Sequence, residues 1–242
     1  MGLSPRVPAL LTVVSFKWFD PGFAHNSLFI YTADYVNRWA SMVSRHLSLP
    51  HELVCCTDDP EGIDPRVRIV PLPDAMKAWP LGQMQKLFVF HPEAGEIFGQ
   101  RILLMDLDCV VLRSIDPLVD RAEPFVAWEP RIYHLRGGDY SRYNTSFVLM
   151  DAGSRSQVWT QFDPHHARAE LTAAGLPSAD EQSWVTHVLG KEEPVWPWDG
   201  EIRSLKATPR PQDARIVFFN GPRSPGMPAV QAEYPWISGH WR

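Results

Sequence analysis

The sequence lacks three features that would each place it in a specialised class of protein. No apolar run approaches the roughly 20 residues that a membrane-spanning helix needs. The N-terminus is apolar for only a few residues and has no small-residue cleavage site, so we expect no signal peptide. Positive charge is in deficit: the formal net charge is −5, which argues against a protein that binds nucleic acid through basic residues.

Cysteine is also scarce. The sequence has three, of which Cys55 and Cys56 are adjacent in an apolar, strand-like run and Cys109 stands alone. Neither arrangement has the spacing of a disulfide framework or of a zinc site. A reducing compartment fits this usage best, so the sequence predicts a cytoplasmic protein.

The composition is otherwise that of a globular protein. Hydrophobic residues make up 45% and charged residues 21% of 242 residues. No repeat, low-complexity segment or convincing linker divides the chain. We therefore expect a single domain over residues 1–242, with an ordered core from about residue 8 to residue 242.

Hydrophobic periodicity predicts strands that alternate with helices. The expected strands cover 10–16, 51–59, 66–73, 101–113, 124–130, 144–153 and 214–221. The expected helices cover 31–47, 81–90, 154–162 and 180–190, the last capped by Asp180, and the tail to Arg242 is expected to be loop-like. This alternation indicates an α/β fold whose mostly parallel central sheet is flanked by helices and binds ligands at the carboxyl ends of its strands.

The expected strand at 101–113 carries two aspartates. Asp106 and Asp108 interrupt apolar residues, and alternation along a strand would turn both side chains to the same face. Two neighbouring carboxylates repel each other and lose solvation as the sheet packs. The pair therefore predicts a bound cation, and carboxylate oxygens favour Mn²⁺ or Mg²⁺.

Three interpretations of this pair are open. The two aspartates could be solvated residues at a strand end that bind nothing. They could belong to a haloacid-dehalogenase-type phosphatase, whose nucleophile strand ends in the same pattern followed by Thr or Val, here Val110 two residues after Asp108. That strand normally lies near the N-terminus, however, and no later strand here ends in the acidic pair that such a phosphatase also needs. The third interpretation is a metal site that neutralises a departing nucleoside diphosphate.

A resemblance to a known family favours the third interpretation. "ILLMDLDCVVLRSIDPL" resembles the Asp-x-Asp strand of GT-A-fold glycosyltransferases, particularly family 8 and related uncharacterised bacterial transferases. Four further segments resemble theirs in the same order: "CCTDDPEGID", "QKLFVF", "YNTSFVLMDAG" and "DEQSW". The Asp-x-Asp pattern alone is weak evidence for the family, but five segments in the same order are much stronger evidence.

The resemblance implies a role for each segment. Asp106 and Asp108 would bind the divalent cation, and Asp106 would also touch the donor. The resemblance also implies that Asp180, Glu181 and Gln182 lie near the reacting carbon of the sugar. The same residue types are typical of a capped helix start. The remaining donor-binding positions that it implies are Lys17, Trp18, Thr57, Asp58, Lys86, Asn144, Thr145 and Ser146.

The C-terminal segment departs from the family pattern. Family 8 enzymes usually carry a histidine metal ligand and a diphosphate-binding lysine there, whereas this chain reads "FFNGPRSPGMP". Asn220 replaces the histidine as a weaker oxygen ligand for the metal. Gly221 and Arg223 would face the donor, and Arg223 would supply charge to the phosphates in place of the lysine.

Together these features predict a metal-dependent glycosyltransferase that moves a sugar from a nucleotide-diphosphate donor, UDP-linked by expectation, to an acceptor that the sequence does not identify. Nucleotidyl transfer would need a glycine-rich loop after the first strand, and "SFKWFDPGFAHN" lacks one. The alternative outside enzymology is a binding protein that kept the fold and lost turnover.

Overall fold

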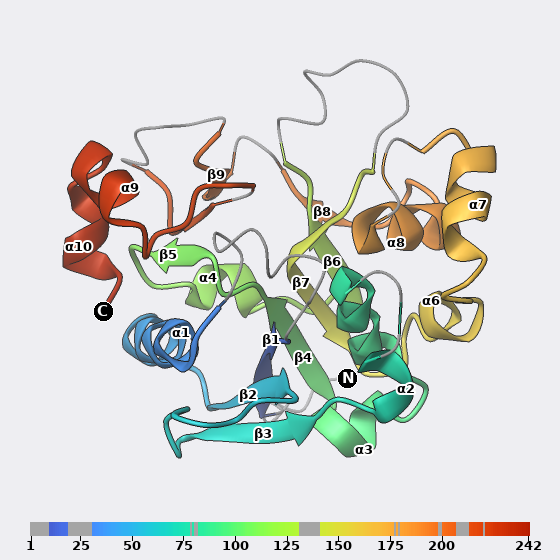
Figure 1. Ribbon diagram of the computed structural model, residues 1–242, viewed down its shortest axis with the longest axis horizontal. Helices are drawn as coiled ribbons and strands as arrows, with labels where there is room; N and C mark the ends of the chain where they lie inside the picture. Colours follow the sequence, from blue (N-terminus) through green and yellow to red (C-terminus); the bar gives the residue numbers. More distant parts are fainter. Residues whose placement is uncertain are drawn as a thin grey trace, which may run out of the picture.

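A seven-stranded sheet runs through the middle of the protein (Figure 1). The computed structural model describes residues 10–18, 31–77, 79, 82–130, 141–176, 178, 180–197, 200–206, 213–219 and 221–242. The strands of this sheet are Leu11–Lys17 (β1), His51–Thr57 (β2), Val67–Pro71 (β3), Arg101–Met105 (β4), Phe125–Trp128 (β6), Asn144–Asp151 (β7) and Val195–Trp196 (β8). Their order across the sheet is β3-β2-β1-β4-β7-β6-β8.

Neighbouring strands are parallel except around β7, which runs antiparallel to both β4 and β6. Strand β1 is buried along its whole length, as expected of a strand that is covered on both faces. Val13 and Leu103 belong to the core cluster on one face, and Val14 and Leu104 belong to the cluster on the other. The mostly parallel α/β sheet that the sequence predicts is therefore confirmed.

A second sheet has three short strands, Cys109–Val111 (β5), Ile202–Ser204 (β9) and Ile216–Phe218 (β10). Strand β10 lies in the middle, antiparallel to β5 and parallel to β9. The prediction of one strand over 101–113 is wrong, because β4 and β5 belong to different sheets. Aspartate is disfavoured within strands, and the chain leaves the strand conformation at residues 106–108. Alternation along a single strand therefore does not orient Asp106 and Asp108.

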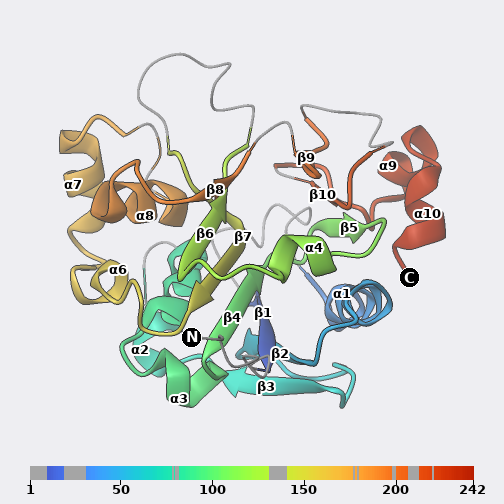
Figure 2. The ribbon, with the colours of Figure 1, turned by 180° about the vertical axis from the view of Figure 1, so that it is seen from behind.

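Helix α1 (Ala33–His46) confirms the helix predicted over 31–47 and buries Val36, Trp39 and Met42 among its apolar residues. The helix predicted over 81–90 is a 3₁₀ helix, η2 (Gly82–Phe90), with all but one of its residues buried. Before the tail, the described residues also form the helices Asp74–Lys77 (α2), Ala94–Phe98 (α3), Asp116–Val119 (α4), Gln157–Thr160 (α6), Ala167–Ala173 (α7) and Glu181–Leu189 (α8). Seen from behind, α6, α7 and α8 lie at the opposite side of the molecule from α1 (Figure 2).

The tail is not loop-like, as the sequence predicts, but contains helices α9 (Pro228–Glu233) and α10 (Trp236–His240). Both lie on the same side of the molecule as α1, with α10 nearer to it (Figure 1). The Tyr35 hydroxyl is 2.6 Å from the Ser224 hydroxyl, and the Arg38 guanidinium lies 4.5 Å from the centre of the Trp241 ring. The C-terminal segment is therefore packed against α1.

All three cysteines are free and buried. Within the described residues, no helix combines the length and the apolar character needed to cross a bilayer.

Candidate functional site

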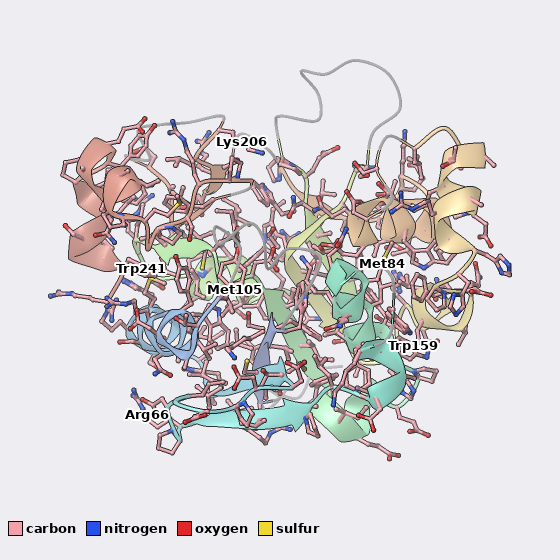
Figure 3. The ribbon with its side chains drawn as sticks, in the orientation of Figure 1. Arg66, Met84, Met105, Trp159, Lys206 and Trp241 are labelled. Carbon is pink, nitrogen blue, oxygen red and sulfur yellow. The ribbon has the colours of Figure 1, made fainter. Side chains whose placement is uncertain are left out.

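The antiparallel direction of β7 brings the start of this strand to the end of β4. Met105, the last residue of β4, pairs with Phe147, and the backbone N–H of Asp106 donates to the Ser146 carbonyl at 3.0 Å. Two of the predicted segments, the Asp-x-Asp turn and the polar residues 144–146, therefore meet at one edge of the sheet. Figure 3 labels Met105 near the centre of the molecule, where this edge lies.

A buried ion-pair network lies at this edge. The Lys86 ammonium is 3.1 and 3.2 Å from the two carboxylate oxygens of Asp106 and 2.6 Å from Oε1 of Glu181. The Thr145 hydroxyl donates to the same Glu181 oxygen at 2.6 Å. The exposed fractions of the side chains are 9% for Lys86, 3% for Glu181 and 22% for Asp106, so Asp106 alone has substantial access to solvent.

This network fixes the charge of Lys86. Burial by itself would lower the pKa of Lys86, but the charges of Asp106 and Glu181 outweigh it and hold the pKa well above its usual value. Lys86 is therefore a permanent cation whose nearest partners are two protein carboxylates. Lys86 is therefore not a solvated surface lysine, because its side chain is buried.

Asp180 caps helix α8, as the sequence predicts. Its carboxylate accepts a hydrogen bond from the Ser183 backbone N–H at 2.8 Å. Burial, together with the neighbouring charge of Glu181, raises the pKa of Asp180 above its usual value. One Asp180 oxygen is therefore used to start the helix that presents Glu181 to Lys86.

Gln182 connects the same helix to the start of β7. Its side-chain oxygen accepts from the Asn144 amide at 2.9 Å, and the Asn144 oxygen accepts from the Ser146 backbone N–H at 2.8 Å. Asn144 is buried, whereas Gln182 is partly exposed. The arrangement holds one end of the Gln182 amide in a fixed direction at the start of β7.

Asp108 lies at the junction of the two sheets. Its carbonyl accepts from the Phe219 backbone N–H at 2.8 Å, and its carboxylate accepts from the Tyr31 hydroxyl. Burial raises the pKa of Asp108 well above its usual value, and the nearby charge of Asp106 raises it further. Ionised Asp108 is therefore costly unless a cation lies close to it. Nothing in the sequence pointed to Tyr31 as its partner.

These two carboxylates fit a divalent metal. Among the described parts of the chain no cluster of three or more His, Cys, Asp or Glu side chains forms a complete metal site. Mg²⁺ in phosphate-transfer sites is commonly held by one or two carboxylates and completed by substrate phosphates and water. Asp106 and Asp108 can supply that carboxylate pair, and a cation would relieve their mutual repulsion. Asn220, the expected third ligand, lies outside the described residues.

The ends of β1 and β2 hold a second ion pair. The Lys17 ammonium is 2.6 Å from the Asp59 carboxylate and 2.7 Å from the Asp59 carbonyl, and the Thr57 hydroxyl accepts from the Asp59 backbone N–H at 3.0 Å. Asp58 is exposed, and Trp18 is partly buried against the core. Lys17 and Thr57 thus meet at Asp59, a neighbour of Asp58 that the sequence analysis did not select.

The C-terminal segment carries the remaining predicted positions. Arg223 is exposed, and its guanidinium donates to Glu233 and to the Tyr234 hydroxyl, both at 3.0 Å. Gly221 has a φ of +97°, and a Cβ added to it would lie 2.8 Å from the ammonium of Lys206.

Comparison with known proteins gives a structural match without a sequence match. No protein-family model matches the chain, and no curated protein does. The crystal structure of galactosyltransferase LgtC in complex with donor and acceptor sugar analogues matches with a TM-score of 0.61 and 13% identity, covering 95% of this chain and 96% of that one. An active-site mutant of LgtC matches with a TM-score of 0.59 and 12% identity, covering 94% and 95%. The chain therefore has the GT-A glycosyltransferase fold of LgtC.

Proposed function

We propose that this protein is a metal-dependent glycosyltransferase that moves a sugar from a nucleotide-diphosphate donor, UDP-linked, to an acceptor. The observation that carries the proposal is the position of Asp106 and Asp108. Within a fold shared over almost the whole chain with LgtC, the two carboxylates follow a central strand at the carboxyl edge of the sheet. The phosphatase alternative required a different fold and has no support from the match.

Asp106 and Asp108 are proposed to hold Mn²⁺ or Mg²⁺. The bound metal would act as a Lewis acid on the departing diphosphate. Lys86 has a positioning role in this scheme, because its contacts at 3.1 and 3.2 Å hold the Asp106 carboxylate in place before any metal arrives. Tyr31 fixes the Asp108 carboxylate in the same way, through its hydroxyl.

Of the three residues that the resemblance implies near the reacting carbon, Gln182 is the one that we assign to sugar binding. Asp180 caps its helix, and Glu181 is buried against Lys86. Gln182 is partly exposed, and the bond from Asn144 to its amide oxygen fixes the plane of an amide whose N–H groups are the kind of donor that suits a hydroxyl or developing negative charge. We assign the nucleotide to the ends of β1 and β2, where Lys17, Trp18, Thr57 and Asp58 lie.

Thermal unfolding with and without metal tests this function. UDP, in a panel with the other nucleoside diphosphates, should stabilise the protein with Mn²⁺ and much less with EDTA. A ligand present at 100 times its Kd adds about 2.7 kcal/mol, which raises the Tm of a chain of this size by about 5–11 °C. Asp108→Asn should lose the Mn²⁺-dependent shift, whereas Asp120→Asn, an exposed aspartate beyond α4, should keep it.

Two outcomes would contradict the proposal in different ways. Equal stabilisation by UDP in Mn²⁺ and in EDTA would exclude the metal site at Asp106 and Asp108. No stabilisation by any nucleoside diphosphate would exclude this class of donor.

A further inference from the structure

We propose that Tyr35 is a positioning residue for the metal site, because it joins the C-terminal segment to Tyr31, the partner of Asp108. The inference rests on the proposed function and adds a residue that acts on the same site through another. Tyr35 lies in the first turn of α1 and is partly buried against the core. The affinity for metal would then depend on how the end of the chain is packed.

On one side, Tyr35 contacts the residue that orients Asp108. The rings of Tyr31 and Tyr35 have centroids 5.2 Å apart and planes tilted by 54°. The Tyr31 hydroxyl donates to the Asp108 carboxylate, which the neighbouring charge of Asp106 repels. A ring contact that fixes Tyr31 therefore also fixes the direction of the Asp108 carboxylate.

On the other side, Tyr35 is held by the C-terminal segment. Its hydroxyl lies 2.6 Å from the Ser224 hydroxyl and accepts a hydrogen bond from the Gly226 backbone N–H. The Trp241 ring meets the Tyr35 ring edge-on, with 5.0 Å between centroids. A Cβ on Gly226 would lie 2.2 Å from the Tyr35 hydroxyl and 2.7 Å from Cη2 of Trp241, so the backbone comes this close because residue 226 is glycine.

Helix α1 also holds the last residues of the chain. The Arg38 guanidinium lies 4.5 Å from the centre of the Trp241 ring and donates to the Trp241 carbonyl at 3.1 Å. Further along the helix, the Arg45 guanidinium donates to the His240 carbonyl at 2.8 Å. Trp241 is only 5% exposed, and Figure 3 labels it close to α1. The contacts of Tyr35 thus belong to a docked segment with several independent attachments.

The C-terminal segment reaches Asp108 by two routes. The Phe219 backbone N–H donates to the Asp108 carbonyl at 2.8 Å, which places the main chain. The second route passes from Gly226 to Tyr35 and on through Tyr31 to the carboxylate, which places the side chain. Removing the direct partner of a metal-ligating group typically costs about 10–100-fold in metal affinity. Tyr35 acts one contact further away, so its effect should be of the same kind and smaller.

The Mn²⁺ affinity of variants, followed by the EPR signal of the free ion with and without UDP, tests the inference. Tyr35→Phe loses both hydroxyl bonds and should weaken Mn²⁺ by at least about threefold, and Tyr35→Ala, which also loses the ring contact with Tyr31, by about tenfold. Thr12→Val is the matched control, since it removes a buried hydroxyl that donates to Glu52 at 3.0 Å at the start of β1. It should lower the melting temperature and leave the Mn²⁺ affinity unchanged.

Gly226→Ala perturbs the same contact from the tail. Its Cβ would push the segment away from the Tyr35 hydroxyl, so this variant should weaken Mn²⁺ about as much as Tyr35→Phe does. In Tyr35→Ala there is no hydroxyl to displace, so adding Gly226→Ala should weaken Mn²⁺ no further. Full additivity of the two changes would overturn the inference, because it would mean that they act on the metal independently.

The outcomes separate this inference from the function on which it rests. If the wild type binds no Mn²⁺, with or without UDP, the proposed function fails and Tyr35 has no metal site to position. If the wild type binds Mn²⁺ and Tyr35→Ala binds it equally well, only the inference fails. Equal weakening of Mn²⁺ in Thr12→Val would also overturn the inference, because the loss would then reflect general destabilisation.

Discussion

Replacement of Lys86 by methionine should be among the most destabilising single changes at the site. The ammonium is the shared partner of Asp106 and Glu181, and the Glu181 side chain is only 3% exposed. Methionine keeps the length and apolar volume of lysine but leaves the Glu181 charge buried without its cation. Removing one partner of a buried ion pair typically costs about 3–5 kcal/mol.

The loss is measurable by urea unfolding and by the melting temperature. For a chain of this size each kcal/mol corresponds to about 2–4 °C in Tm, so the variant should melt about 6–20 °C below the wild type. A loss of that size is a large fraction of the total stability of a typical domain, about 5–15 kcal/mol. The double variant Lys86→Met/Glu181→Gln should recover part of it, because the buried charge is then absent and the amide oxygen can still accept from Thr145.

Two results would refute this reasoning about Lys86. A loss below about 1 kcal/mol for Lys86→Met would place the pair among solvent-screened surface ion pairs, in spite of its burial. A double variant no more stable than Lys86→Met would show that the uncompensated charge of Glu181 is not the source of the loss.

Two further predictions concern turnover and the C-terminal segment. Incubation with a panel of UDP-sugars and Mn²⁺ should release UDP from at least one donor by slow transfer of the sugar to water. Gln182→Ala should slow this release at least about tenfold if its amide stabilises developing charge. Release of phosphate from simple phosphomonoesters, with no UDP from any donor, would contradict glycosyl transfer. Gly221→Ala and Gly175→Ala should each lose about 1–2 kcal/mol of stability in denaturant unfolding, because both glycines have positive φ. The loss should be the larger at Gly221, since its Cβ would also displace the flexible end of Lys206, whereas nothing lies within 4 Å at Gly175; a larger loss for Gly175→Ala would contradict the prediction.

The sequence predicted the elements whose burial follows a regular period. Helix α1 carries a stripe of apolar residues at helical spacing and was located to within two residues at its start and one at its end. The nine residues of η2 are almost all buried, so they have no apolar stripe that could distinguish a 3₁₀ from an α-helix. Strands β8 and β9 have two and three residues, which is too short for any period to be visible.

The candidate site shows the same limit at the level of single residues. The sequence selected Lys86, Asp106 and Glu181 separately, each as a group that would face the donor. That they bind one another follows from the antiparallel direction of β7 and from the start of α8 beside it, which local patterns do not encode. The break between β4 and β5 was missed because apolar residues flank it on both sides, although the aspartates themselves were its signal.

The pairing of β5 with β10 has a consequence for the order of events in folding. Cys109 pairs with Phe218, so this contact joins parts of the chain that are far apart in sequence, whereas β1 and β2 pair across a much shorter separation, with Leu11 opposite His51. Closing a long segment costs more entropy and slows the pairing that depends on it. We therefore expect the sheet around β1 to be established before Asp108 reaches its final place, and a chain emerging from the ribosome cannot complete this part of the site until the residues of β10 have been synthesised.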